Sequence, residues 1–186
     1  MNPSAVSPLL EIETLFETHG CLIYGESVNQ IQHALQCATL AQQQGVSESL
    51  IVAALLHDVG HMMHRDAAAA LAAGNDDVHE KLGAKFLAKW FGPDVTQPVA
   101  LHVQAKRYLC YREPEYNLHL SGISRKTLAI QGGAMSREQA GAFEQQPHWA
   151  EAVSLRRWDD LGKQESMETI SWQDGISMAI RCVRLI

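Results

Sequence analysis

The segment Ile51–Leu56 is apolar at every position and runs directly into the polar pair His57-Asp58. It is too short to cross a membrane, and a helix that is apolar on all sides belongs in a core, so we predict a buried helix over 51–61. An imidazole and a carboxylate at the end of such a helix must be paired or bind a metal, because an unpaired charge is costly to bury. The alternative is a capped helix end with an incidental histidine.

The rest of the chain also shows apolar residues at helical spacing, interrupted by Gly and Pro. Helices are predicted over residues 7–16, 27–44, 78–91, 96–111, 124–130, 149–161 and 176–185, with another beginning at Ser136 and a loop over 112–117. Little of the sequence alternates as a β-strand does, and neither a repeat nor a linker divides it. We therefore expect one all-α domain over residues 1–186, a helical bundle around a central site.

Composition narrows the class of partner. The chain has 15 Lys and Arg against 21 Asp and Glu, a formal net charge of −6, which disfavours non-specific binding to nucleic acid. The start lacks the basic and apolar segments of a secretory leader, and the four cysteines form no C-x-x-C pair. The sequence predicts a cytoplasmic protein that binds neither nucleic acid nor a membrane, and it leaves the oligomeric state open.

Side chains of metal-binding type stand at separate positions along the predicted helices: His33, His57, Asp58, His79, His102 and Asp159. Outside the His57-Asp58 pair, each of these residues alone is more often a core or surface residue than a ligand. Consecutive helical residues diverge by about 100°, so His57 can face one metal while Asp58 leans toward a second. Imidazole and carboxylate ligands suit iron, manganese or zinc. The order H…HD…D resembles the HD-domain superfamily, and the additional histidines resemble its di-metal members, with Asp58 as the bridging carboxylate.

Several short sequence blocks resemble one particular group within the HD-domain superfamily. They are GESVNQ at 25–30, HVQAKRYL at 102–109, SRKTL at 124–128, QGGAM at 131–135 and RRWD at 156–159. In this combination and order they resemble the HD-domain oxygenases that cleave the carbon–phosphorus bond of 1-hydroxyphosphonates. The resemblance extends from about Tyr24 to Lys163. It implies two iron ions in the mixed-valence Fe(II)/Fe(III) state, O2 as co-substrate and a small-molecule 1-hydroxyphosphonate as substrate.

The resemblance also distributes roles among the residues. It implies that one iron is held by His33, His57, Asp58 and Asp159, and the second by Asp58, His79 and His102. Lys106 lies one helical turn past His102, and Arg156 lies one turn before Asp159, on the same faces as these ligands. A phosphonate dianion needs several donors, and we predict that it is anchored by Lys106, Arg156, Ser124 and His61. The alternative is that Lys106 and Arg156 are surface charges, the usual fate of these residue types.

The segment before the second predicted helix bears on the far end of the substrate. Family members that act on a primary amine carry a tyrosine three residues before the glutamate, where this chain has Ile23, and the nearby tyrosine is Tyr24. Together with Glu26, these residues are compatible with a trimethylammonium group, which offers no N–H donor. The expected substrate is 1-hydroxy-2-(trimethylammonio)ethylphosphonate, giving phosphate and glycine betaine, or glycine from the primary amine. The alternative is that Ile23 and Tyr24 are packing residues.

Two hypotheses of other classes remain open at this point. One is a metal-dependent HD phosphohydrolase, which would cleave a phosphoester with a metal-activated water and without oxygen. The other is a non-catalytic HD module used in signalling or assembly, which the intact set of candidate ligands and basic residues disfavours.

Overall fold

The computed structural model describes residues 7–23, 27–63 and 78–184. Within these ranges the chain is helical and contains no strand, which confirms the all-α fold. The helices are α1 (Leu10–His19), α2 (Gln30–Gln43), α3 (Glu48–Leu56), α4 (Val59–Met63), α6 (His79–Leu87), α7 (Pro93–Arg112), α8 (Tyr116–His119), α9 (Gly122–Ile130), α10 (Arg137–Phe143), α11 (Trp149–Leu161) and α12 (Trp172–Arg181). In these ranges no helix is long and apolar enough to span a membrane. The single domain over residues 1–186 stays a prediction.

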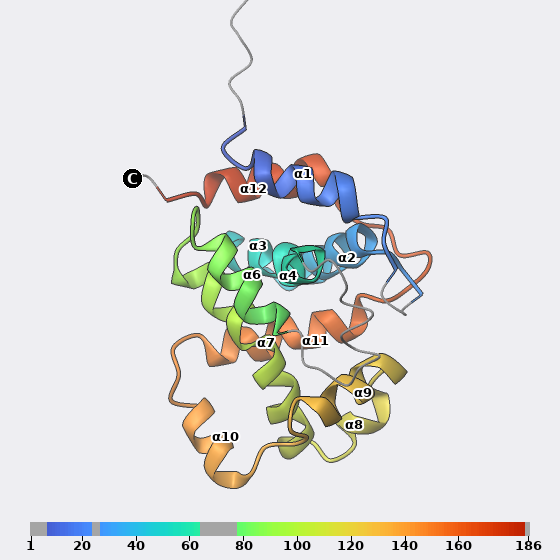
Figure 1. The fold of residues 1–186 in the computed structure, drawn as a ribbon, viewed down its shortest axis with the longest axis vertical. Helices are drawn as coiled ribbons and strands as arrows, with labels where there is room; N and C mark the ends of the chain where they lie inside the picture. The colour runs from blue at the N-terminus through green and yellow to red at the C-terminus, as the bar shows by residue number, and fades with distance from the viewer. Residues whose placement is uncertain (1–6, 24–26, 64–77, 185–186) are drawn as a thin grey trace, which may run out of the picture.

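Helix α3 lies at the centre of the main core. It packs against α2, α7, α11 and α12, and its Val52, Ala53, Ala54 and Leu56 have no exposed surface. Figure 1 shows α1 and α12 together at one end of the molecule, α2, α3 and α4 beneath them, and α8, α9 and α10 at the far end. The long helix α7 runs from the middle of the molecule to the far end, and α11 crosses it. The apolar helix is therefore enclosed by helices, as its sequence predicts.

Capping residues fix where α2 begins. The side chain of Asn29 accepts a hydrogen bond from the Gln32 backbone N–H at 2.9 Å, and the Gln32 side chain accepts one from the Asn29 backbone N–H at 3.0 Å. This reciprocal capping box satisfies donors that the first turn of a helix leaves without partners. Helix α2 therefore begins at Gln30 and not at the predicted Ser27, and it carries His33 into the core in its first turn.

The predicted single helix over 51–61 is wrong. Helix α3 ends at Leu56, α4 begins at Val59, and His57 and Asp58 occupy the turn between them. The turn lets α4 pack on α6, where the two backbones approach closely: a Cβ atom on Gly60 would come within 2.0 Å of the His79 carbonyl oxygen. Both members of the His-Asp pair thus reach the same polar centre, and His57 Nε2 lies 3.5 Å from Asp58 Oδ1.

Other boundaries also differ from the prediction. Helix α7 begins at Pro93 and not at residue 96, because a proline in the first turn lacks only an N–H that has no helical partner there. Helix α12 begins at Trp172, four residues before the predicted start, after the N-cap Ser171. The predicted loop over 112–117 overlaps α8, whose Tyr116 hydroxyl donates to Asp160 of α11. A contact from a distant helix stabilises this short element, and its own sequence does not signal it.

The close approach at Gly60 yields a stability prediction. Gly60→Ala should lower the free energy of unfolding by about 1–3 kcal/mol, the usual cost of overpacking, because the neighbouring atoms belong to backbone and cannot rotate away. Gly141→Ala is the matched control, since a Cβ on Gly141 in α10 meets nothing within 4 Å. Chemical denaturation of both variants measures the difference. Equal stability of the two variants would contradict the packing described for α4 and α6.

Candidate metal centre

A central carboxylate, Asp58, lies among four imidazoles from different elements. Its Oδ2 atom is 3.6 Å from His33 Nε2. Its Oδ1 atom is 3.5 Å from His57 Nε2, 3.7 Å from His79 Nε2 and 3.8 Å from His102 Nε2. Because the two carboxylate oxygens face different histidines, each oxygen can serve a different cation. This geometry suits the bridging role that the sequence predicts for Asp58, and that role stays a prediction.

The sixth predicted ligand, Asp159 of α11, closes the other side of the cluster. Its Oδ1 atom lies 3.5 Å from His33 Nε2, and its Oδ2 atom lies 3.9 Å from His57 Nε2. Burial opposes ionisation of this carboxyl, but the Arg156 guanidinium and then Lys163 hold the pKa of Asp159 well below its usual range. Asp159 is therefore an anion, which is the form that binds a metal. The structure thus brings all six predicted ligands together.

Backbone carbonyls orient three of the four imidazoles. A carbonyl oxygen can only accept, so the ring Nδ1–H must be the donor in each pair. The pairs are His33 with Gly162 O at 2.7 Å, His57 with Ala54 O at 2.9 Å and His102 with Val99 O at 2.7 Å. These bonds leave the Nε2 lone pairs directed at the cluster, an arrangement common to metal-binding histidines. The ring orientations are consequently set by the fold.

The chemistry of the donor atoms fits a cation. His57 is completely buried, and within the described ranges its Nε2 atom has no hydrogen-bond partner, a cost that a bound metal would remove. The Nε2 atoms of His79 and His102 lie 3.1 Å apart. Burial lowers the pKa of His102 well below its usual value, with His79 contributing, so His102 is a neutral imidazole of the kind that binds metals.

Two further side chains adjoin the cluster. Cys37 lies one turn after His33, and its Sγ is 3.8 Å from both ring nitrogens of that histidine. Burial raises the pKa of Cys37, so it remains a neutral thiol, which donates to the Trp158 carbonyl at 3.5 Å. His61 stacks on the ring of His79 with 3.7 Å between centroids. The structure therefore places His61 beside the metal ligands.

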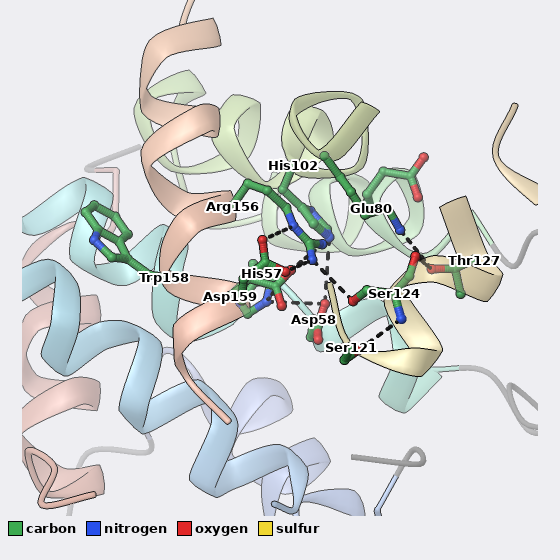
Figure 2. Close-up of polar contacts among 12 residues, drawn as sticks. His57, Asp58, Glu80, His102, Ser121, Ser124, Thr127, Arg156, Trp158 and Asp159 are labelled. Atoms are coloured by element: carbon green, nitrogen blue, oxygen red, sulfur yellow. Dashed lines mark hydrogen bonds and ion pairs between the residues drawn. The ribbon is translucent and has the colours of Figure 1, made fainter. Parts of the chain in front are cut away.

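Next to the cluster lies a buried group of cationic and hydroxyl side chains, Lys106, Ser124 and Arg156, which we call the anion pocket; Figure 2 shows the contacts of Arg156 and Ser124. Lys106, Ser124 and Arg156 are each 5% exposed or less. Lys106 Nζ donates to Thr127 Oγ1 at 2.8 Å, and Arg156 Nη2 donates to Ser124 Oγ at 3.3 Å. Lys163 Nζ lies 3.4 Å from the same Ser124 oxygen. The hypothesis that Lys106 and Arg156 are surface charges is wrong, since both are buried.

Asp159, a member of the metal cluster, also contacts the neighbouring cationic side chains. Arg156 Nη1 lies 2.7 Å from Asp159 Oδ2, and Lys163 Nζ lies 3.5 Å from Asp159 Oδ1. An anion held by these cations would therefore sit directly beside the metal ligands.

Comparison with known proteins identifies the family of this chain. The HD-domain family matches residues 31–129. The chain is 43% identical over 163 residues to the hydroxymethylphosphonate dioxygenase of Gimesia maris, covering 86% of this chain and 80% of that protein. It is 39% identical over 170 residues to the glycine-betaine-forming [1-hydroxy-2-(trimethylamino)ethyl]phosphonate dioxygenase of Leisingera caerulea, covering 91% and 87%. The chain belongs to the HD-domain phosphonate oxygenases.

A third relative is the uncharacterized protein L432 of Acanthamoeba polyphaga mimivirus, 37% identical over 163 residues, with 82% of this chain and 71% of that protein covered. Membership of the family makes this protein an oxygenase and excludes a non-catalytic HD module as its best description.

The structure describes only part of the segment before α2 that the sequence analysis connects with the far end of the substrate. Ile23 is 63% exposed, so the structure does not bury it against the site. Tyr24 and Glu26 lie outside the described residues. Their predicted contact with the far end of the substrate stays a prediction.

The structure adds residues that the sequence analysis did not single out. Thr127 lies one turn after Ser124 in the SRKTL block, and Lys163 lies one turn after Asp159, so helical spacing from a known site residue could have found both. Tyr116 and Asp160 accept hydrogen bonds from the Nε atom of Arg156. No local spacing signals Tyr116, because it reaches the site from α8.

Burial gives Lys106 an unusual charge state. Desolvation, with a smaller effect of the Arg156 charge, lowers the pKa of Lys106 to about 7. The side chain is therefore close to half protonated at neutral pH. An anion bound beside it would favour the protonated form, since opposite charges stabilise each other.

The bridging position of Asp58 predicts metal loss. Asp58→Ala should remove both metals, because the carboxylate faces the imidazoles of both predicted positions. Metal content per chain, measured on purified protein, tests this. Glu138→Ala, an exposed acidic residue in α10, is the control and should leave the metal content unchanged. Full metal content in Asp58→Ala would refute the bridging role.

Because Lys106 is buried, we predict that replacing its charged group stabilises the protein, and that the gain in stability depends on pH. Its folded pKa of about 7 lies below the unfolded value of about 10.4, so the unfolded chain binds the extra proton between these values. The destabilisation by Lys106 is therefore complete below pH 7 and declines as pH rises toward 10. In phosphate-free buffer, Lys106→Met should raise Tm by several degrees at pH 6.5, and the gain should shrink at pH 9.5.

Lys126→Met is the control for this measurement, because Lys126 is an exposed residue of α9. It should change Tm little at either pH. A Lys106→Met protein that is less stable than the parent at pH 6.5 would show that Lys106 stabilises the fold, contrary to its burial.

Proposed function

We propose that this oxygenase cleaves the carbon–phosphorus bond of a 1-hydroxyphosphonate oxidatively and releases phosphate. The observation that carries the proposal is the buried pocket of Lys106, Ser124 and Arg156, which adjoins a cluster of four imidazoles and two carboxylates. The names of the two dioxygenase relatives support the same reaction class. A hydrolase on the same fold would also bind phosphate, but these relatives favour oxygen chemistry.

The six clustered side chains fit two iron ions. In this proposal His33, His57, Asp58 and Asp159 hold one iron, and Asp58, His79 and His102 hold the other. When bound, a mixed-valence Fe(II)/Fe(III) pair supplies the redox chemistry that uses O2 as co-substrate. The protein fixes the ligands in advance, because their rings are already oriented by backbone carbonyls.

The anion pocket holds the phosphonate group while the bond to carbon breaks. Lys106 and Arg156 neutralise the dianion, and Ser124 donates a hydroxyl hydrogen bond, so that C1 faces the metal ligands. His61, which stacks on His79, can donate to the substrate from the metal side. The overall reaction is balanced: a 1-hydroxyphosphonate and O2 give a carboxylate, hydrogen phosphate and one proton. The two oxygen atoms of O2 account for the two that the products gain.

The finer substrate assignment is 1-hydroxy-2-(trimethylammonio)ethylphosphonate, with glycine betaine as the product. It rests on Ile23, Tyr24 and Glu26 in the sequence and on the printed name of the Leisingera relative. A quaternary ammonium is recognised by charge and by apolar or aromatic surface, and Glu26 and Tyr24 offer both. The second candidate is hydroxymethylphosphonate, which the Gimesia relative's name and the exposure of Ile23 favour.

The test is a comparison of substrates with iron-loaded protein. Phosphate release and O2 consumption are measured with the trimethylammonio, primary-amine and hydroxymethyl compounds, and we expect one O2 per phosphate and the highest kcat/KM for the trimethylammonio compound. Glu26→Gln should lower kcat/KM for that compound and leave the value for hydroxymethylphosphonate unchanged. A higher kcat/KM for hydroxymethylphosphonate would establish the second candidate. Phosphate release from an ester under anaerobic conditions would establish a phosphohydrolase instead.

A further inference from the structure

Two residues outside the metal cluster, Tyr116 and Asp160, form hydrogen bonds with the guanidinium of Arg156. Asp160 accepts from Arg156 through both Nε, at 3.2 Å, and Nη2. The Tyr116 hydroxyl accepts from Arg156 Nε at 3.2 Å and donates to Asp160 Oδ2. The three side chains therefore form a closed ring of hydrogen bonds between α8 and α11.

The two edges of this guanidinium face different surroundings. The Nε–Nη2 edge contacts Asp160 and Tyr116. At the terminal end, Nη1 contacts Asp159, and Nη2 donates to Ser124 as well as to Asp160. A guanidinium is planar and presents its donors in a fixed fork. Fixing the Nε–Nη2 edge therefore fixes the direction in which the terminal donors point. An arginine without such support would rotate about its long side chain and lose rotamer entropy on binding an anion.

The supporting pair lies between the buried Arg156 and the surface. The Asp160 side chain is 16% exposed and Arg156 is 4% exposed. Tyr116 and Asp160 line an open cleft of about 750 Å³, formed by the residues around α8 and the end of α11. Burial raises the pKa of Tyr116 well above its ordinary value, so its hydroxyl remains a donor to Asp160. The pair therefore lies on the side of Arg156 that faces the cleft.

We propose that Asp160 and Tyr116 are positioning residues that hold Arg156 ready for the phosphonate group. This inference rests on the proposed function insofar as Arg156 is the anchor of an anion. It assigns no direct contact with substrate to either residue. The expected consequence is a loss of affinity for the phosphorus group, with metal binding and the catalytic step largely preserved.

If the charge of Asp160 were its only contribution, its removal would change the affinity for an anion in the opposite direction. Asp160 carries a negative charge near the position of a dianion, so its neutralisation would strengthen anion binding if charge were its only contribution. Positioning predicts weaker binding, because Arg156 loses the partner that orders it. The direction of the change in affinity therefore distinguishes the two roles.

The probe is inorganic phosphate, whose binding to the metal-loaded protein is measured by calorimetry. Asp160→Asn should weaken phosphate binding about tenfold, and Tyr116→Phe about threefold, in line with lost hydrogen bonds to a charged and a neutral partner. Arg157→Gln is the matched control: the adjacent residue of α11 makes an exposed ion pair with Glu113 of the α7–α8 connection. It should leave phosphate affinity unchanged. With substrate, Asp160→Asn should raise KM by a similar factor and leave kcat within about twofold.

A double-mutant cycle shows whether Asp160 acts through Arg156. In an Arg156→Lys background, Asp160→Asn should change phosphate affinity less than twofold, because the fork that it orients is gone. An unchanged or tighter affinity in the single Asp160→Asn protein would overturn the inference. So would an equal loss in both backgrounds. Tyr116→Phe keeps the inference falsifiable if Asp160→Asn does not fold, since it removes one hydroxyl and must still weaken phosphate binding.

The phosphate measurements separate this inference from the proposed function. A wild-type protein that binds phosphate but releases none from a hydroxyphosphonate would refute the proposed reaction, while the cycle would still test the role of Asp160. A wild-type protein that binds no phosphate would overturn the positioning role, because Arg156 would then anchor no anion.

Discussion

The rest of the structure depends on the Asp58 carboxylate, whose side chain is 18% exposed and lies among the four predicted imidazole ligands and His61. Burial opposes ionisation of Asp58, yet His57 and His61 hold its pKa well below the usual range. An anion can remain in such a place only if cations or donors surround it. Helices α2, α6 and α7 bring His33, His79 and His102 to this carboxylate at the end of α3. Helix α11 adds the second carboxylate, Asp159, together with its cationic partner Arg156. The packing of the helices thus determines which polar side chains surround Asp58.

The metal cluster was predictable from sequence because its residues resemble the HD-domain pattern, and helical spacing from these residues predicted two of the neighbouring cations. Lys106 and Arg156 lie one turn from His102 and Asp159, and the structure finds both cations buried beside the metal cluster. The break at His57-Asp58 was not predictable, since the residues on either side of it continue the helical pattern. That break depends on the contact of Gly60 with the backbone of α6, which is a tertiary contact without a local signal.

The support behind Arg156 escaped prediction for a similar reason. Tyr116 follows Pro114 in a segment whose composition indicates a loop, and its helical turn is stabilised by Asp160 from another element. The Gln36 side chain shows the same principle: its Nε2 donates to the Gln164 carbonyl oxygen at 2.7 Å, and its Oε1 accepts from the Gln164 backbone N–H at 3.0 Å. Such long-range polar contacts place the residues after α11 against α2. Sequence spacing carries no information about them.

The ion pair between Arg156 and Asp159 joins the two halves of the site in one thermodynamic system. A cation bound by Asp159 would compete with Arg156 for that carboxylate, so the terminal nitrogen of Arg156 would become more available to an incoming anion. Any such coupling free energy acts equally in both directions. An anion that engages Arg156 therefore increases the affinity of Asp159 for its cation by the same factor as the cation increases the affinity for the anion. A metal held by Asp159 would consequently be retained most firmly while an anion is bound at Arg156.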